Sequence, residues 1–367
     1  MRGTGRVLGA LMCTAVMAAG AAMLCLVPGG ELTALLLFAP GAVSALWQQA
    51  EMQAEPAAAP AIQPELTPQP TEQPAETPVP EPTASPAAAP QPEITVPPGT
   101  QATEPIQDQT FGQGRGQGYI TLAAGSIKNT TDEPDAVLAA AVQKELPFAV
   151  QPGSREPQVL ILHTHATETY QTWDTPVYDP DFTARTKDTS LNMCAVGEAM
   201  AKVLNDAGIA TLHDTTLHDS PSYTESYARS AQTARSYLEK YPSIKVVLDV
   251  HRDAIESGNA RVRPITMLDG QPTAQVMIIA GCNNGTTINL PDWQKNLCFA
   301  AKWEESMETL YPGLTRPVLC GYRFYNQDVC TGALLIEIGG HANTVQQAVR
   351  AGQYAAKALA ALFGGTV

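Results

Sequence analysis

The 367-residue sequence lacks several patterns that would assign a function directly. Its 7 cysteines form no CxxC pair, so neither a thiolate zinc site nor a redox dithiol is indicated. No G-x-S-x-G motif is present, and no cysteine lies in a cluster of polar residues, so nucleophilic catalysis has no obvious centre. Basic residues are scarce. The formal net charge is -14, and no block of Lys and Arg could follow a phosphate backbone, so nucleic acid is not an expected partner.

The cysteines of the C-terminal half indicate no disulfide framework. There are five of them, at positions 194, 282, 298, 320 and 330, and an odd number leaves at least one unpaired. We interpret them as buried free thiols. A 320–330 or a 282–298 disulfide is the alternative.

The N-terminus combines basic residues with a long apolar run. Arg2 and Arg6 precede an uninterrupted run from Val7 to Val27, which has about the 20 residues that a spanning helix needs. Basic residues before the run predict that the N-terminus is inside and the remainder outside. We therefore expect residues 1–30 to be an uncleaved, single-pass anchor in the cell membrane, with the rest of the chain on the extracytoplasmic side. A cleaved signal peptide is the alternative.

Residues 31–117 are expected to be a disordered linker. From residue 50 onward they are rich in Pro, Ala, Gln, Thr and Glu, and no aromatic residue occurs before Phe111. Such a segment cannot bury enough apolar surface to offset the entropy of ordering it. Dense proline favours an extended polyproline conformation, which suits a tether that holds a domain away from a membrane.

Residues 118–367 have the composition and patterning of a folded domain. Short, β-branched apolar runs at 158–164, 244–250, 274–280 and 333–339 predict buried strands. Helical periodicity predicts helices within residues 189–209, 222–242, 292–313 and 343–365. Strands that are apolar along their length and alternate with helices predict an α/β fold. We expect a twisted, largely parallel sheet flanked by helices.

Polar side chains follow three of these strands. The first run leads into His163, His165 and Glu168, in the sequence "VLILHTHATE". The second leads into "DVHRD", from Asp249 to Asp253, and the third contains Glu337 and is followed by His341 and Asn343. A single histidine at a strand end is more often structural than functional. Three such strands in one domain favour a site, because ligands of α/β folds bind at the carboxyl ends of the strands.

Two histidines and one glutamate of this group form a potential zinc site. His165 and Glu168 make an H-x-x-E pair on the loop after the first strand, and His251 from another strand would complete the set. His, Glu and His with one open position are typical ligands of hydrolytic zinc, which activates water and polarises a carbonyl. His163 is the alternative to His165 as the first ligand.

Glu337 is the predicted catalytic carboxylate. A carboxylate that is not a ligand must accept the proton of water and transfer it to the leaving nitrogen. Glu337 lies in an apolar strand, where an unpaired carboxylate is costly to bury. The alternative is a structural salt bridge between Glu337 and Arg252. We also place Arg252 in the site, because an arginine there could hold a free carboxylate of the substrate, as could Arg261.

Taken together, the motifs resemble the stage II sporulation protein P family. The similar segments include "LILHTHATETY", "IKNTTD", "SYARS", "VLDVHRDAI" and "LLIEIGGHANT", and the resemblance covers about residues 118 to 360. It implies a zinc-dependent N-acetylmuramoyl-L-alanine amidase, with a fold like that of amidases and zinc carboxypeptidases. Such a protein would cut the amide between the lactyl group of the glycan and the stem peptide. It would also have endopeptidase activity on peptide cross-links.

The resemblance also implies partners and roles for individual residues. Peptidoglycan would be the substrate, and sporulation proteins D and M would be partners during engulfment of the forespore. By position, His165 and His251 would be zinc ligands and Glu337 the catalytic carboxylate. Broader amidases take their ligand glutamate from just before a helix, where this chain reads "TARTKDTSLN" without glutamate. We therefore assign Glu168 by analogy with the H-x-x-E pair of zinc carboxypeptidases.

Two other functions fit the same residues. A zinc carboxypeptidase or endopeptidase acting on the stem peptide could use the same ligands. A non-catalytic cell-wall-binding module could keep the fold without a complete metal site.

Overall fold

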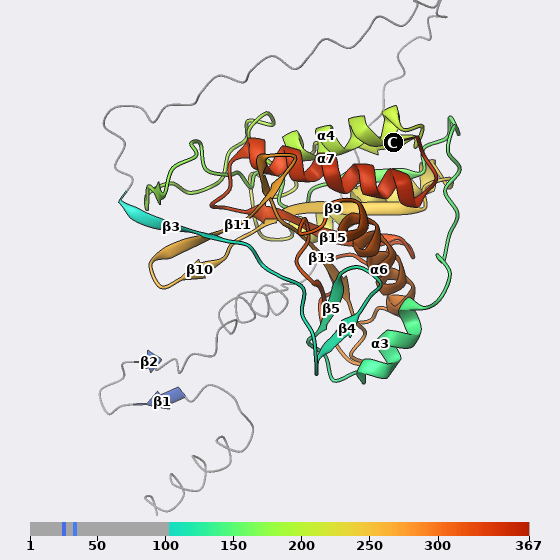
Figure 1. The fold of residues 1–367 in the computed structure, drawn as a ribbon, viewed down its shortest axis with the longest axis horizontal. Coiled ribbons are helices and arrows are strands. Elements are labelled where there is room, and N and C mark those ends of the chain that lie inside the picture. Colours follow the sequence, from blue (N-terminus) through green and yellow to red (C-terminus); the bar gives the residue numbers. More distant parts are fainter. Residues whose placement is uncertain (1–23, 27–31, 35–102, 367) are drawn as a thin grey trace, which may run out of the picture. The chain divides into compact units, whose positions relative to one another are not determined.

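The computed structural model describes residues 24–26, 32–34 and 103–366 (Figure 1). Strands β1 (Leu24–Leu26) and β2 (Leu32–Ala34) form an antiparallel pair within one compact unit, Met1–Pro86. Of the predicted anchor run, only Leu24–Leu26 are described, and they are extended where a helix is expected. The rest of that run lies outside the described residues. No helix in the described parts of the chain is sufficiently long and apolar to cross a membrane.

A mixed sheet of eight strands forms the centre of the second unit, Ala87–Val367. Its order is β4-β5-β14-β13-β15-β9-β6-β8. Five neighbouring pairs are parallel, and two, β4–β5 and β13–β15, are antiparallel. The prediction of a largely parallel sheet is therefore confirmed, except that β13 runs against β15. The strands are β4 (Tyr119–Thr121), β5 (Ser126–Asn129), β6 (Val159–Leu162), β8 (Thr211–His213), β9 (Val246–Asp253), β13 (Val276–Gly281), β14 (Val318–Gly321) and β15 (Ala333–Gly340).

The four long helices lie where the periodicity predicts them. They are α4 (Met193–Asp206), α5 (Ser226–Lys240), α6 (Trp293–Leu310) and α7 (Val345–Leu362), and a shorter helix, α3 (Asp135–Val142), precedes them. Two of their starts are fixed by side-chain caps. The Asn192 side chain accepts a hydrogen bond from the amide of Cys194, and Thr344 forms a capping box with Gln347.

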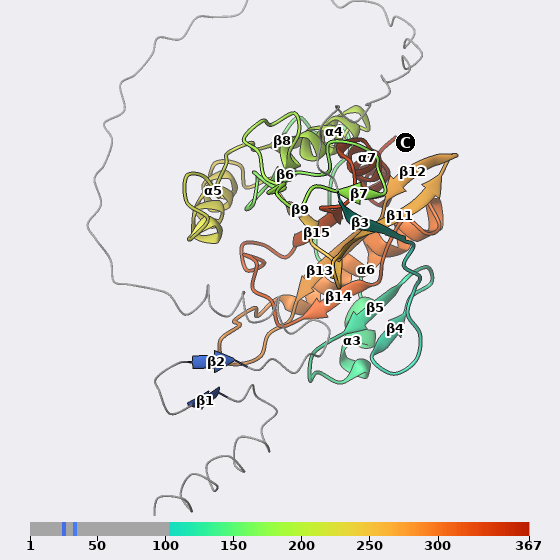
Figure 2. The same ribbon diagram turned by 90° about the vertical axis from the view of Figure 1, so that its left-hand side faces the viewer.

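The helices cover the two faces of the sheet unequally (Figure 2). Val246, Leu248 and Val250 of β9 belong to the large core that contains α4, α6 and α7, whereas Val247 packs in a small cluster with Ala234 of α5. Alternate residues of a strand point to opposite faces. Asp249 and His251 therefore lie on the same face as Val247, the one that α5 covers.

A second, smaller sheet corrects the predicted domain boundary. Its strands are β3 (Glu104–Gln109), β7 (Val177–Tyr178), β10 (Glu256–Ser257), β11 (Ala260–Leu268) and β12 (Gln271–Ala274). Strand β3 pairs in parallel with β11 and antiparallel with β7, so the folded domain begins before residue 104 and not at residue 118. Only Ile106 of β3 is buried, which explains why this part of the predicted linker has almost no apolar pattern. Residues 35–102 of that linker lie outside the described residues.

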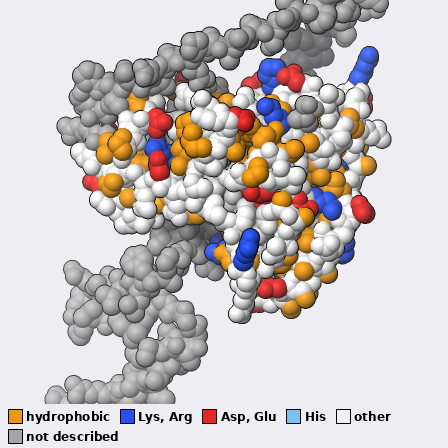
Figure 3. Space-filling model, viewed as in Figure 1, with side chains coloured by type: hydrophobic (Ala, Val, Ile, Leu, Met, Phe, Trp, Pro, Cys, Tyr) orange, Lys and Arg blue, Asp and Glu red, His pale blue; other side chains and the backbone are white. Residues whose placement is uncertain are grey.

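The five cysteines of the C-terminal half are free thiols. Cys194, Cys282, Cys298 and Cys320 are buried and Cys330 is partly exposed, so neither alternative disulfide is present. Acidic and basic side chains are interspersed among apolar ones on the face drawn in Figure 3, which has no broad basic patch.

Candidate functional site

The three polar strand ends meet at one edge of the main sheet. Strands β15, β9 and β6 are neighbours and run parallel to one another. The register aligns Glu337 with His251 and Leu162 with Asp249. Because residues aligned on parallel neighbours point to the same face, Glu337, His251 and Asp249 share the face that α5 covers. The chain leaves β6 at Leu162 and brings His165 and Glu168 to the same place on the following turn.

Asp249 positions the imidazole of His251. Nε2 of His251 lies 2.8 Å from Oδ1 of Asp249, and both residues are buried. The backbone amide and the hydroxyl of Thr164 donate hydrogen bonds of 2.8 and 2.6 Å to the Asp249 carboxylate. Burial raises the pKa of Asp249, but His251 and Thr164 outweigh it, so the net pKa is lowered and the group remains a carboxylate. Nδ1 of His251 is thereby directed toward Glu168.

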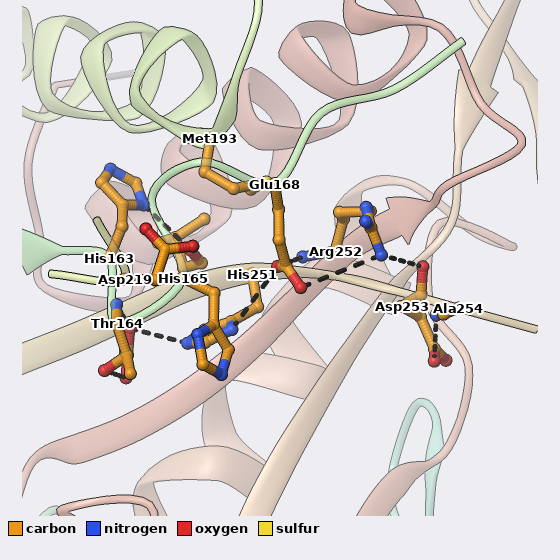
Figure 4. A network of polar contacts seen from close by, with 12 residues as sticks. His163, Thr164, His165, Glu168, Met193, Asp219, His251, Arg252, Asp253 and Ala254 are labelled. Atoms are coloured by element: carbon orange, nitrogen blue, oxygen red, sulfur yellow. Dashed lines mark hydrogen bonds and ion pairs between the residues drawn. The ribbon is translucent and has the colours of Figure 1, made fainter. Parts of the chain in front are cut away.

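Glu168 faces His251 across a short gap (Figure 4). Its Oε2 lies 3.7 Å from Nδ1 of His251, and its Oε1 lies 3.7 Å from Arg185 and 3.8 Å from Arg252. Burial raises the pKa of Glu168, but Arg252, His251 and His165 outweigh it and hold the pKa well below its usual range. The same carboxylate and Asp249 outweigh the effect of burial on His251 and raise the pKa of its imidazole. The Glu168 carboxylate and Nδ1 of the His251 imidazole therefore face each other at the strand ends.

His165 completes the group from the side of α5. Its ring centroid is 5.3 Å from that of His251 and 4.4 Å from that of Tyr223, on which it stacks. The Tyr223 hydroxyl lies 3.0 Å from its Nε2, and the Ser226 hydroxyl lies 3.5 Å from its Nδ1. Burial lowers the pKa of His165 to about 4, so the imidazole is neutral at pH 7, the form that binds zinc.

His163 points away from this group (Figure 4). Its Nδ1 lies 2.8 Å from the carbonyl oxygen of Val250 and can only donate there, and its Nε2 lies 2.9 Å from Nε2 of His213. A Cβ added at Gly197 of α4 would come within 2.5 Å of both Nε2 atoms, so the two imidazoles pack closely under that helix. His163 therefore packs under α4, while His165 lies beside His251. Of the two alternatives, His165 is the one placed to be a ligand.

Glu337 is close to the predicted ligands without being paired. It is the register neighbour of His251, and its Oε2 is buried with no hydrogen-bond partner. Burial and the neighbouring Asp253 raise the pKa of Glu337 to about 8. No ion pair joins Glu337 to Arg252 in the described part of the chain, so the alternative structural salt bridge is wrong. An unpaired carboxyl with this pKa can take up and release a proton near neutral pH.

The guanidinium of Arg252 donates hydrogen bonds to backbone carbonyl oxygens. Its Nε donates to the carbonyl oxygen of Thr169 at 3.0 Å, its Nη2 to that of Ala184 at 3.1 Å, and its Nη1 to that of Asp253 at 3.4 Å. Each guanidinium nitrogen therefore has a partner within the protein. These bonds use three of its five N–H groups, so the role of Arg252 in holding a free substrate carboxylate stays a prediction. The residue fixes the loop that carries Glu168.

The donor chemistry of the site fits zinc, although the donors do not converge fully. Neutral His165, ionised Glu168 and His251 held by a carboxylate are the ligand types that zinc prefers. Among the described residues, no group of three or more His, Cys, Asp or Glu side chains is already arranged so that it could hold a metal ion.

The sequence reasoning missed the role of Asp249 and of Tyr223. Asp249 and His251 are two residues apart on one strand, and this spacing places both on the same face, so the pattern D-x-H carried a usable signal. Tyr223 had no such signal. It stacks on His165 from the segment before α5, 58 residues away in the sequence.

Comparison with known proteins identifies the family. The model of the family "Stage II sporulation protein P" matches residues 96–360. The stage II sporulation protein P of Bacillus subtilis (strain 168) is 27% identical over 216 residues, which cover 56% of this chain and 51% of that protein. This chain thus spans about half the length of that relative. The family match covers most of the chain, so the chain belongs to the stage II sporulation protein P family, and the resemblance seen in the sequence is confirmed.

The solved structures found are amidases with low similarity to this chain. An N-acetylmuramoyl-L-alanine amidase from Clostridium difficile 630 is 14% identical, with a TM-score of 0.35, over 57% of this chain and 95% of its own. The CwlD amidase from Clostridioides difficile, solved in complex with the GerS lipoprotein, is 11% identical, with a TM-score of 0.33, over 56% of this chain and 94% of its own.

Proposed function

We propose that this chain is a zinc-dependent peptidoglycan hydrolase that cuts the N-acetylmuramoyl-L-alanine amide bond during engulfment in sporulation. The main support is the alignment of Glu337 with His251 on neighbouring parallel strands. This alignment sets an unpaired carboxyl beside a predicted ligand. Membership of the stage II sporulation protein P family supports the biological setting.

His165, Glu168 and His251 would hold the zinc. Zinc bound there would supply a Lewis acid that activates water and polarises the amide carbonyl. Asp249 keeps the His251 ring in place through its contact with Nε2, and Arg252 keeps the Glu168 loop in place through the backbone carbonyls of Thr169 and Ala184. These supports matter because a displacement of about 1 Å in a reacting group can cost about 100-fold in rate.

Glu337 would move the proton. Its carboxylate form accepts a proton from the attacking water, and its carboxyl form then donates that proton to the leaving nitrogen of the stem peptide. The pKa of about 8 keeps both forms accessible near neutral pH. The Oε2 atom of Glu337 is buried, but the residue as a whole is partly exposed, which leaves room for water and substrate to reach it.

The setting of the reaction belongs to the same proposal. We place the second unit of the chain on the extracytoplasmic side of the cell membrane, tethered by residues 1–30 through the proline-rich segment. Sporulation proteins D and M are the proposed partners, and endopeptidase activity on peptide cross-links is a proposed second activity.

Mass spectrometry of the products released from purified sacculi tests the proposed bond. An amidase releases stem peptides that begin with a free L-alanine amine and leaves glycan without peptide. Release of C-terminal residues alone would instead identify a carboxypeptidase. Binding without any released product would identify a wall-binding module. The Glu337→Gln chain is the matched control, because it keeps the shape of the site and lacks only the ionisable group.

A further inference from the structure

Arg261 is a buried guanidinium without an acidic partner. Two other buried arginines pair with aspartates: Arg263 with Asp108 and Asp174, and Arg316 with Asp253, although Nε and Nη2 of Arg316 also lack a hydrogen-bond partner. Arg261 has no such pair, and its Nε and Nη1 atoms are shielded from solvent without a hydrogen-bond partner. An arginine keeps its charge at any ordinary pH. Two N–H groups that are shielded from water and have no hydrogen-bond partner therefore destabilise the folded protein.

The guanidinium of Arg261 is nevertheless held in one place. Its Cζ lies 3.9 Å from the centroid of the Tyr178 ring, on which the planar group packs. The Tyr178 hydroxyl donates to the carbonyl oxygen of Asn259, which fixes the ring. Arg261 as a residue is only half-buried, so a ligand can reach it from solvent.

A second unpartnered nitrogen belongs to His341. This residue follows β15 and is buried, with 4% of its surface exposed. Its Nε2 has no hydrogen-bond partner. The amide of His341 donates to the carbonyl oxygen of Asp253 at 2.9 Å, and the amide of Val262, next to Arg261, donates to that of Ile255 at 2.8 Å, so both residues flank the end of β9. The side chain of Gln171, on the loop that carries Glu168, donates to the carbonyl oxygen of His341 at 3.3 Å, so His341 adjoins the proposed zinc site.

We propose that Arg261, together with His341 near the end of β9, forms a subsite that binds a free carboxylate of the stem peptide. The planar fork of a guanidinium matches the two oxygens of a carboxylate, and a bidentate pair would satisfy both unpartnered nitrogens of Arg261. Arg252 is less suited to this role, because each of its guanidinium nitrogens already donates to a backbone carbonyl.

The choice of a peptide carboxylate rests on the proposed function. A stem peptide carries free carboxylates near the amide that is cut, and the subsite lies next to Glu168. Binding energy at such a position would orient the peptide relative to Glu337 and would separate substrates with a free carboxylate from substrates in which it is amidated.

The subsite is tested with two soluble muramyl peptides. They differ only in their stem carboxylates, which are free in one peptide and converted to primary amides in the other. Affinity is measured by calorimetry with the full-length, zinc-loaded Glu337→Gln chain, so the test does not depend on turnover. We expect the free acid to bind about 10- to 100-fold more tightly than the amide. Arg261→Gln in the same chain should remove this preference, and His341→Gln should reduce it.

Arg235→Gln is the charge-matched control, because Arg235 lies exposed on α5 and pairs with Asp328 away from the site. It should keep the full preference. Arg261→Lys keeps the charge but lacks the planar guanidinium, so it should keep only part of the preference for the free acid. This variant replaces Arg261→Gln in the test if Arg261→Gln is unstable. Equal preference in the Arg261→Gln, Arg235→Gln and unsubstituted chains would overturn the subsite. Absence of hydrolysis by the chain with Glu337 intact, with the preference still present, would overturn the proposed function and leave the subsite standing.

Discussion

Nε2 of His251 lies 2.8 Å from Oδ1 of Asp249, two residues earlier on the same strand. The contact leaves Nδ1 of His251 facing Oε2 of Glu168. A carboxylate that holds the far nitrogen of a ligand histidine is the usual support of a zinc site. The backbone amide of Thr164 binds the same Asp249 oxygen, so the loop after β6 and the end of β9 are joined at this carboxylate.

The first prediction concerns this support. Asp249→Asn removes the charge that holds His251, and we expect zinc affinity to fall about 10- to 100-fold. Competition with a chromogenic chelator measures the affinity. Asp188→Asn, an exposed residue on the loop before α4, is the control and should leave it unchanged. Unchanged affinity in Asp249→Asn would mean that His251 is not a ligand.

The second prediction separates the base from the ligand. Glu337→Gln should keep its zinc and lose turnover by about 10²- to 10⁴-fold, the range for a lost general base. Glu168→Gln should lose zinc affinity first, and excess zinc should restore part of its turnover. Zinc content by elemental analysis and the rate on soluble muropeptides are measured on the same samples. The opposite pattern would exchange the two roles.

The position of the site could be predicted from the sequence because it depends on regular strands. Apolar runs that end in polar residues predict parallel strands, and parallel neighbours bring their carboxyl ends to one edge. The choice between His163 and His165 could not be made in this way. In a strand, two residues with this spacing would share a face, but β6 ends at Leu162, and the turn that follows sends their side chains apart.

The roles that the sequence left open depend on contacts between distant segments. Arg252 binds the carbonyl oxygens of Thr169 and Ala184, which lie 83 and 68 residues away in the sequence. No local pattern distinguishes such a clamp from an arginine that binds substrate. Strand β3 was missed for a related reason: it has one buried residue, Ile106, and its pairing partner β11 lies more than 150 residues later.

The third prediction concerns the start of the domain. A chain that begins at residue 118 lacks β3, the ion pair between Asp108 and Arg263, and the hydrogen bonds from Gln113 to Thr315. We expect it to unfold at a lower urea concentration than a chain that begins at Ala87, or to be insoluble. Circular dichroism during urea titration compares the two. Equal midpoints would show that β3 contributes nothing to stability.

The last prediction concerns Glu304, a buried carboxyl of α6 that lies apart from the proposed site. Its Oε1 accepts a hydrogen bond of 2.6 Å from the Thr315 hydroxyl, and its Oε2 is buried without a partner. Burial, reinforced by Glu308, raises the pKa of Glu304 well above its ordinary value. A raised pKa in the folded state means that the stabilising effect of the protonated form is complete below the unfolded pKa and is lost as the pH rises toward the folded one.

Ionisation of Glu304 should therefore lower the free energy of unfolding of a chain beginning at Ala87 as the pH rises above about 4.5, by up to about 1.4 kcal/mol per pH unit relative to Glu304→Gln. Glu304→Gln cannot ionise, so its slope over this range should be shallower, and it should be at least as stable as the unsubstituted chain at pH 8. Glu239→Gln, an exposed position on α5, should keep the original slope. Urea titrations between pH 5 and pH 8 measure these slopes. If Glu304→Gln has the same slope as Glu239→Gln, Glu304 must be ionised in the folded protein, and its second oxygen must have a partner such as a bound water.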